Sequence, residues 1–112
     1  MRKEIAESWV KALRSDKYRQ GDGYLKKHDE DGNQFCCLGV LCEVMGMELH
    51  SWDEEVLDDE KMKLTGIGTE DGELEEPVTY RGKVYTNLAA LNDAGAPFKH
   101  IADVIEANWE KL

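Results

Sequence analysis

Apolar residues follow a helical period in two parts of the N-terminal half. A stripe with a spacing of four residues predicts an amphipathic helix over residues 4–15. Residues 37–45 are apolar on nearly every side, which is typical of a helix at the centre of a core. Gly46 would end this helix, and Gly39 inside it predicts that another backbone segment approaches closely. The stripe of the first helix consists of Ile5, Trp9 and Leu13.

Two further helices are predicted in the C-terminal part. Thr86 or Asn87 can cap a short helix over residues 88–94, which Gly95 would end. Pro97 suits the first turn of a last helix that continues to residue 109. The apolar stripe of that helix consists of Phe98, Ile101, Ala102, Ile105 and Trp109.

Glycine-containing turns between strand-forming residues predict two short hairpins. The first would pair residues 24–28 with residues 34–37 across Asp31-Gly32. The second would cover residues 78–86, with its turn at Arg81-Gly82 or Gly82-Lys83. Helices and hairpins in this order predict an α+β fold: a single small domain over residues 1–112, with three to four helices and one or two short antiparallel β-hairpins.

The composition is that of one folded domain. The chain has 112 residues, of which 41% are hydrophobic and 34% are charged. No apolar run approaches the roughly 20 residues that span a bilayer. The charged N-terminal residues lack the apolar centre of a signal peptide. We therefore expect a cytoplasmic protein with no membrane partner.

Charge is distributed unevenly along the chain. The formal net charge is −10, and residues 48–76 account for all of it with 12 acidic and two basic residues. Residues 1–28 hold eight basic and four acidic residues. The overall acidity disfavours nucleic acid as a partner, whereas the basic first quarter could hold one small anion.

The acidic segment 48–76 is predicted to be a solvated loop or a lid over the core. Glycines at positions 66, 68 and 72 indicate loop structure. Scattered apolar residues would anchor the segment to the core. These residues are Trp52, Val56, Leu57, Met62, Leu64 and Ile67.

Three cysteines and three dispersed histidines raise the question of a metal site or a thiol nucleophile. Cys36 and Cys37 are adjacent, and Cys42 lies on the apolar helix, so the spacing differs from that of structural zinc sites. We therefore expect buried, reduced thiols, with no metal, no cofactor and no catalytic residue. The alternative is an enzyme with a cysteine-bound metal or a cysteine nucleophile, because a helix N-terminus could lower the pKa of Cys36 or Cys37. The histidines are His28, His50 and His100.

A glycine-rich loop in the basic first quarter is the candidate ligand site. The sequence Arg19-Gln20-Gly21-Asp22-Gly23 offers backbone N–H groups and an arginine, and a tyrosine flanks each side. Together with the Leu91-Asn92-Asp93 turn, this loop would form a pocket for a small anionic, nucleotide-like ligand. The opposing interpretation is a tight loop with packed tyrosines. The predicted ligand-binding residues are Tyr18, Arg19, Gln20, Tyr24, Asn92 and Asp93.

Three segments of the chain resemble a known group of proteins. They are Trp9 to Gly21, Phe35 to Cys42 and Leu88 to Glu106. The chain resembles a family of small, mostly uncharacterised proteins of tailed bacteriophages and prophages, with Cys-Cys-Leu-Gly-Val-Leu-Cys as the most specific motif. Residues 47–85 are the least recognisable part. The resemblance implies a phage origin and the cytoplasm of an infected bacterium, and it supplies no catalytic residues.

These observations predict a phage-encoded, non-enzymatic accessory protein that acts on its host by binding. In one mode it would sequester a small nucleotide-like immune signal as an anti-defence protein. In a second mode, the acidic segment would inhibit a host protein by docking its basic surface, in the manner of a DNA mimic. Besides the cysteine- or metal-dependent enzyme, a DNA-binding regulator that uses residues 88–109 is a further alternative, although that segment is not basic. A homodimer is compatible with all of these hypotheses.

Overall fold

The structure is a computed structural model and describes residues 1–50 and 54–112. This part of the chain forms five α-helices, one short 3-10 helix and two antiparallel hairpins. This architecture confirms the predicted α+β class, with one helix more than expected. The helices are α1 (Lys3–Arg14), α2 (Cys37–Val44), α3 (Asp59–Thr65), α4 (Leu88–Asp93), α5 (Phe98–Asn108) and the 3-10 helix η1 (Trp109–Lys111). The strands are β1 (Lys26–Asp29), β2 (Gly32–Phe35), β3 (Glu73–Tyr80) and β4 (Lys83–Asn87).

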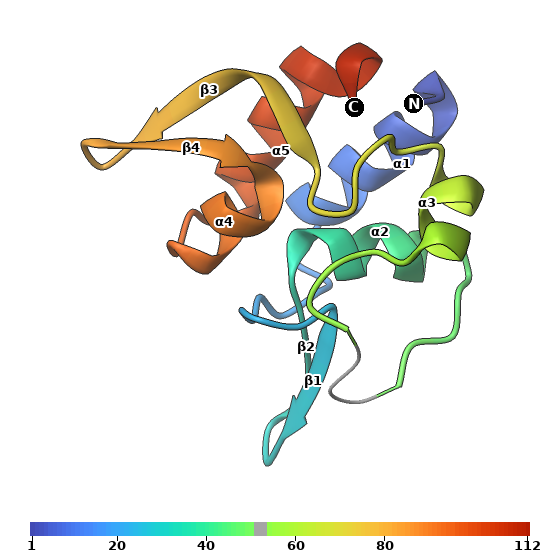
Figure 1. The fold of residues 1–112 in the computed structure, drawn as a ribbon. Coiled ribbons are helices and arrows are strands. Elements are labelled where there is room, and N and C mark those ends of the chain that lie inside the picture. The colour runs from blue at the N-terminus through green and yellow to red at the C-terminus, as the bar shows by residue number, and fades with distance from the viewer. Residues whose placement is uncertain (51–53) are drawn as a thin grey trace.

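Helix α2 lies in the middle of the core, as its apolar sequence predicts. Helices α1, α3 and α4 contact it, and α5 packs along α1 and against α4 (Figure 1). The predicted stripe of α1 is buried, with Trp9 fully inaccessible. The indole Nε1 of Trp9 donates a hydrogen bond to the carbonyl oxygen of Cys37 at 2.8 Å, which ties α1 to the first turn of α2. Gly39 of α2 faces the backbone of Leu25, so the predicted close approach is confirmed.

The first hairpin turns one residue earlier than predicted. Asp29 pairs with Gly32, so Glu30 and Asp31 form the turn. The side chain of Asp29 stabilises this turn by accepting a hydrogen bond from the N–H of Asp31 at 2.9 Å. Gly32 follows with a φ of 114°, which glycine adopts without strain. Glycine therefore marks the residue after this turn rather than its second position.

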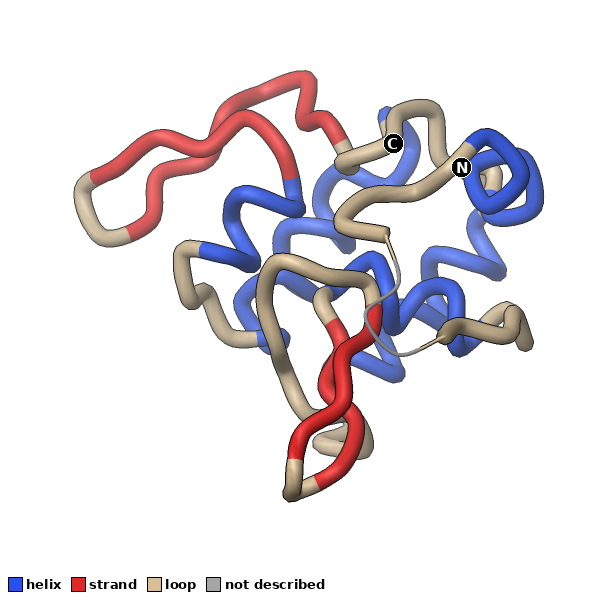
Figure 2. Tube along the Cα trace, turned by 60° about the horizontal axis from the view of Figure 1, so that its bottom comes forward, coloured by secondary structure: helices blue, strands red, loops and turns tan. Residues whose placement is uncertain are grey.

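The second hairpin confirms one of the two predicted turns. Arg81 and Gly82 both have a positive φ, 49° and 79°, as a two-residue turn of type I′ requires. The register is regular from Val78 to the turn and irregular before it. The two hairpins leave the helices on different sides of the molecule (Figure 2).

The acidic segment contains more regular structure than the expected loop. Asp58 accepts a hydrogen bond from the N–H of Lys61 at 2.8 Å and so caps α3, and Gly66 ends this helix with a φ of 78°. The segment also includes the first residues of β3. A helix therefore interrupts the expected loop or lid, because Asp58, which the sequence does not distinguish from the acidic residues around it, caps α3. Trp52, which was predicted to anchor the segment, lies outside the described residues.

Three backbone hydrogen bonds tie this segment to the rest of the molecule. The carbonyl oxygen of Glu54 accepts from the N–H of Leu25 at 2.9 Å, and that of Gly72 accepts from the N–H of Leu88 at 3.0 Å. The N–H of Gly68 donates to the carbonyl oxygen of Leu112 at 3.0 Å. Side chains are buried along the same stretch. They are Leu49, Leu57, Thr65, Ile67 and Leu74.

Candidate functional site

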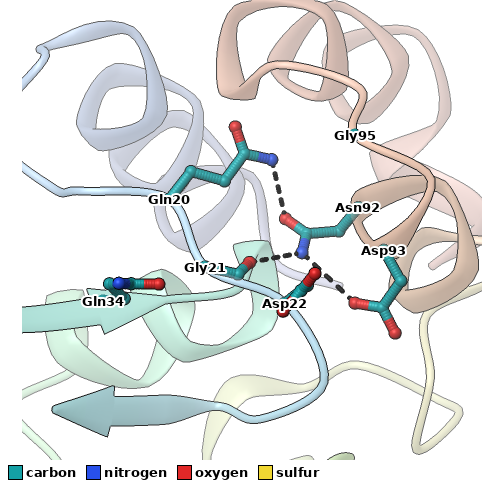
Figure 3. A pocket seen from close by; sticks show the side chains of 7 residues that line it. All are labelled: Gln20, Gly21, Asp22, Gln34, Asn92, Asp93 and Gly95. Carbon is teal, nitrogen blue, oxygen red and sulfur yellow. Dashed lines mark hydrogen bonds between the residues drawn. The ribbon is translucent and has the colours of Figure 1, made fainter. Parts of the chain in front are cut away.

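The glycine-rich loop and the end of α4 meet at a pocket, as the sequence predicts. The pocket has a volume of about 290 Å³ and opens beside the first hairpin (Figure 3). It is lined by Gln20, Gly21, Asp22, Gln34, Asn92, Asp93 and Gly95. Three of the six predicted ligand residues, Gln20, Asn92 and Asp93, are therefore brought together.

Gln20 connects the glycine-rich loop to the start of α5. Its Nε2 donates to the Oδ1 of Asn92 at 3.0 Å and to the carbonyl oxygen of Ala96 at 2.7 Å. Its Oε1 accepts a hydrogen bond from the N–H of Phe98 at 3.1 Å. The helix begins after Pro97, which offers no side-chain cap. Gln20 therefore supplies from a distant loop the acceptor that the first N–H of α5 needs.

Asn92 is the centre of this network and is only 2% exposed. Its Oδ1 accepts from Gln20 and from the N–H of Cys37 at 3.2 Å, and its Nδ2 donates to the carbonyl oxygen of Gly21 at 2.8 Å. A longer contact of 3.5 Å joins Nδ2 to Asp93 (Figure 3). An amide has two donor hydrogens and two acceptor sites, and Asn92 uses all four. A ligand could bind this amide only by replacing a contact that holds the fold.

Carboxylates dominate the electrostatics of the pocket. The Oδ1 of Asp93 accepts a hydrogen bond from the N–H of Gly23 at 3.0 Å, and the side chain is otherwise exposed. Asp22 pairs with Lys27 at 2.7 Å, and the hydrogen bond from Lys27 lowers the pKa of Asp22. None of the residues that line the pocket is basic. A phosphate group would therefore meet repulsion there rather than a positive counterpart.

The other three predicted ligand residues lie outside the pocket lining. The guanidinium of Arg19 donates two hydrogen bonds to the carboxylate of Asp29, at 2.8 and 2.7 Å. Tyr18 packs its ring edge-on against Phe35, with the centroids 5.6 Å apart. Tyr24 is half-buried on the same loop. Arg19 and Tyr18 thus fit the alternative interpretation of a tight loop with a packed tyrosine.

The basic residues of the first quarter lie apart on the molecule. Arg14 binds two carboxylates of α5, Asp103 at 2.6 Å and Glu106 at 2.8 Å. Arg19 instead binds Asp29 on the first hairpin. The Nζ of Lys26 donates to the carbonyl oxygen of Leu49 at 3.1 Å. Arg14 and Lys26 therefore bind different neighbours. Lys11 and Arg14 line a hollow beside Glu7 and Glu106, and no basic residue lines the pocket at the glycine-rich loop.

The three cysteines are buried. The nucleophile hypothesis requires a lowered thiol pKa, whereas burial raises the pKa of Cys36 and Cys37. Cys36 caps α2 by accepting a hydrogen bond from the N–H of Gly39 at 3.4 Å. Burial nevertheless raises the pKa of Cys36 to about 11, and it raises the pKa of Cys37 well above its usual value. Neither thiol carries the lowered pKa that a nucleophile needs. Cys42 is fully buried as well.

Two features of the described residues bear on the hypotheses of a metal site and of a membrane partner. Residues 1–50 and 54–112 contain no group of three or more His, Cys, Asp or Glu side chains placed to hold a metal ion. Within the same residues, none of the helices has the length and apolar character needed to cross a bilayer.

A second hollow was missed by sequence reasoning. It has a volume of about 340 Å³ and lies between the end of α2 and α3. Met45, Met47 and Leu64 line it with apolar side chains, which are called its apolar floor below, and Glu48, Glu60 and Lys61 line it with charged ones. The sequence signal for this hollow is the pair of methionines on either side of Gly46. Gly46 by itself predicts only the end of a helix.

Comparison with known proteins gives one match. No curated protein and no solved structure is similar to the chain. The model of one protein family matches residues 1–87, which is more than half of the 112 residues. The matched part includes the glycine-rich loop, α2, the acidic segment and both hairpins. The chain therefore belongs to the family described as Domain of unknown function (DUF8296).

Proposed function

We propose that this protein is a non-enzymatic binding protein whose acidic surface docks onto a basic surface of a partner protein. The partner would be a protein of the bacterial host if the chain is an accessory protein of a phage. The observation that carries this proposal is the exposure of the carboxylates in segment 48–76, which are together called the acidic surface. Of its 11 described acidic residues, nine are exposed and two are half-exposed.

The described acidic residues belong to a part of the chain that packs against the core. Buried side chains and three backbone hydrogen bonds fix the segment to the core. A flexible acidic tail would lose conformational entropy on binding, and a prearranged surface avoids most of that cost. Opposite charges on the two partners would also speed their encounter at low ionic strength.

A matched pair of variants tests the proposal. The first carries Glu55→Gln, Asp59→Asn and Glu60→Gln within the segment. The second carries Glu4→Gln, Glu30→Gln and Glu110→Gln, all exposed residues outside it. Both variants lose the same amount of negative charge. Asp58 is left unchanged because it caps α3.

The measurement is capture of proteins from a bacterial lysate by the immobilised full chain, followed by identification and repetition with the purified partner. We expect a basic protein that the unmodified chain and the second variant retain and that the first variant loses. Its capture should weaken as salt rises. Equal capture by the two variants, or capture that salt does not change, would contradict the proposal.

The small-ligand mode is a second candidate, supported by the meeting of the two predicted segments at one pocket. Its chemistry is less favourable for a nucleotide, because Asp22 and Asp93 line the pocket and Arg19 is bound to Asp29. Thermal-shift measurements with cyclic nucleotides and ADP-ribose derivatives test it. A rise in the unfolding temperature that Asp93→Asn strengthens would support binding in this pocket, and no rise at millimolar ligand would exclude it.

A further inference from the structure

An exposed leucine lies inside the proposed acidic surface. Among the described residues, the large apolar side chains that remain exposed are Leu64, at 54%, and Val84, at 65%. Leu64 belongs to α3 and lines the hollow of about 340 Å³, whereas Val84 lies on β4 and does not. A single exposed apolar residue is ordinary, but one that borders a hollow with an apolar floor offers a place for an apolar anchor.

The floor of the hollow results from the way in which α2 ends. Gly46 has a φ of 74°, and the N–H of Met47 donates to the carbonyl oxygen of Cys42 at 3.0 Å, so the chain reverses tightly there. Met45 and Met47 remain half-buried on this turn. Helix α3 lies against α2 (Figure 1) and completes the hollow with Leu64. Methionine side chains adapt their shape to different apolar partners, so this floor would tolerate several anchors.

Two carboxylates and one ammonium group border this apolar floor. Glu48 and Glu60 line the hollow, and both are exposed. Lys61 also lines it, but its Nζ binds the carboxylate of Asp58 at 3.0 Å and only 17% of its side chain is exposed. The carbonyl end of α2 adds partial negative charge on the same side. A second copy of this acidic surface would be repelled, so we expect the occupant to be basic.

We propose that the hollow between α2 and α3 receives an apolar side chain from a basic, amphipathic segment of the partner protein. The apolar anchor would lie on Met45, Met47 and Leu64, while lysine or arginine residues beside it would meet Glu48 and Glu60. This inference rests on the proposed function and names the part of the acidic surface where the partner is held. The carboxylates supply attraction at long range, and the burial of the anchor supplies preference among basic partners.

Two synthetic peptides test the inference with the full chain. One is a 14-residue peptide of leucine and lysine arranged to give an apolar and a basic helical face. The other carries serine at every leucine position, so its charge is the same and the anchor is missing. We expect the leucine peptide to bind about tenfold more tightly by titration calorimetry or fluorescence anisotropy. Leu64→Gln should remove this preference, and Val84→Gln is the matched control that should preserve it.

The outcomes separate the inference from the proposed function. If both peptides bind equally, or if Leu64→Gln preserves the preference, the hollow is not the anchor site even where the acidic surface binds. The variant with Glu55→Gln, Asp59→Asn and Glu60→Gln should weaken both peptides together. If it weakens neither, the proposed acidic surface itself is contradicted. Leu64 and Val84 are exposed, so substitution of either residue by glutamine leaves the core intact.

Discussion

Gly39 lies against the backbone of Leu25, so closely that a Cβ built on Gly39 would stand 1.8 Å from the carbonyl oxygen of Leu25. Helix α2 therefore crosses beneath the chain that leads into the first hairpin with no room for a side chain. The N–H of Leu25 in turn binds the carbonyl oxygen of Glu54. One glycine in the central helix thus allows both the first hairpin and the acidic segment to reach their positions.

We expect Gly39→Ala to destabilise the protein. On helix propensity alone, alanine would be favoured by about 1 kcal/mol. The clash is with backbone atoms, which cannot rotate away as a side chain would, and overpacking of this kind costs about 1–3 kcal/mol or more. Urea unfolding followed by Trp fluorescence measures the net effect. A variant as stable as the natural protein would show that the two backbones are further apart than described.

Asn92→Asp should be destabilising although the two side chains have the same shape. The carboxylate would place an acceptor where Nδ2 now donates to the carbonyl oxygen of Gly21. A buried donor or acceptor that loses its partner costs about 1–3 kcal/mol. Thermal unfolding measures the loss, and Asp93→Asn, at an exposed neighbouring position, serves as the control. Equal melting temperatures for Asn92→Asp and the natural protein would contradict the structural role of Asn92.

The pair formed by Arg19 and Asp29 predicts a pH dependence. Hydrogen bonds from Arg19, above all, hold the pKa of Asp29 well below its usual range, and the N–H of Asp31 adds to the effect. A carboxyl with a lowered pKa in the folded state stabilises the protein above about pH 4, and this contribution is lost as pH falls further. Asp29→Asn should therefore be less stable than the natural protein at pH 7. Urea midpoints should converge progressively as pH falls below about 4, and a constant difference would contradict the pairing.

The buried thiols should resist labelling until the protein unfolds. Burial raises the pKa of Cys36 to about 11, so at pH 8 the reactive thiolate is a very small fraction, and Cys37 and Cys42 are fully inaccessible. A thiol reagent such as iodoacetamide should modify none of the three cysteines under native conditions and all three in guanidinium chloride. Intact mass measures the count. Rapid labelling of Cys36 in the native protein would contradict its burial and would support the nucleophile hypothesis.

Sequence reasoning found the elements whose signals are local. The stripe of Ile5, Trp9 and Leu13 predicts α1, and the turn expected at Arg81-Gly82 or Gly82-Lys83 lies at Arg81-Gly82. Helix α3 was missed because its propensity signal is short and its capping aspartate stands among many other acidic residues. Local periodicity therefore predicts the long helices, and local turn signals predict the hairpins, whereas a seven-residue helix depends on a single cap.

The candidate site was predicted in position better than in chemistry. Gln20 and Asn92, 72 residues apart, do meet. Their side-chain amides bond to each other and to backbone groups. These bonds could not be inferred from the sequence, because each partner comes from a different element. Arg19 was expected to be available for phosphate, but a carboxylate ten residues later in the chain binds it. The pairing of surface charges depends on the three-dimensional arrangement of side chains, which composition does not reveal.

The family boundary at residue 87 falls immediately before α4, yet the interior continues across it. Leu88, Leu91, Ile101 and Ile105 are all fully inaccessible, and α5 packs along α1. A polypeptide that stops at residue 87 would expose the apolar face of α1 to water and would leave Gln20 without Asn92. We expect such a fragment to show no cooperative melting transition. The independent folding unit is thus larger than the stretch by which its relatives are recognised.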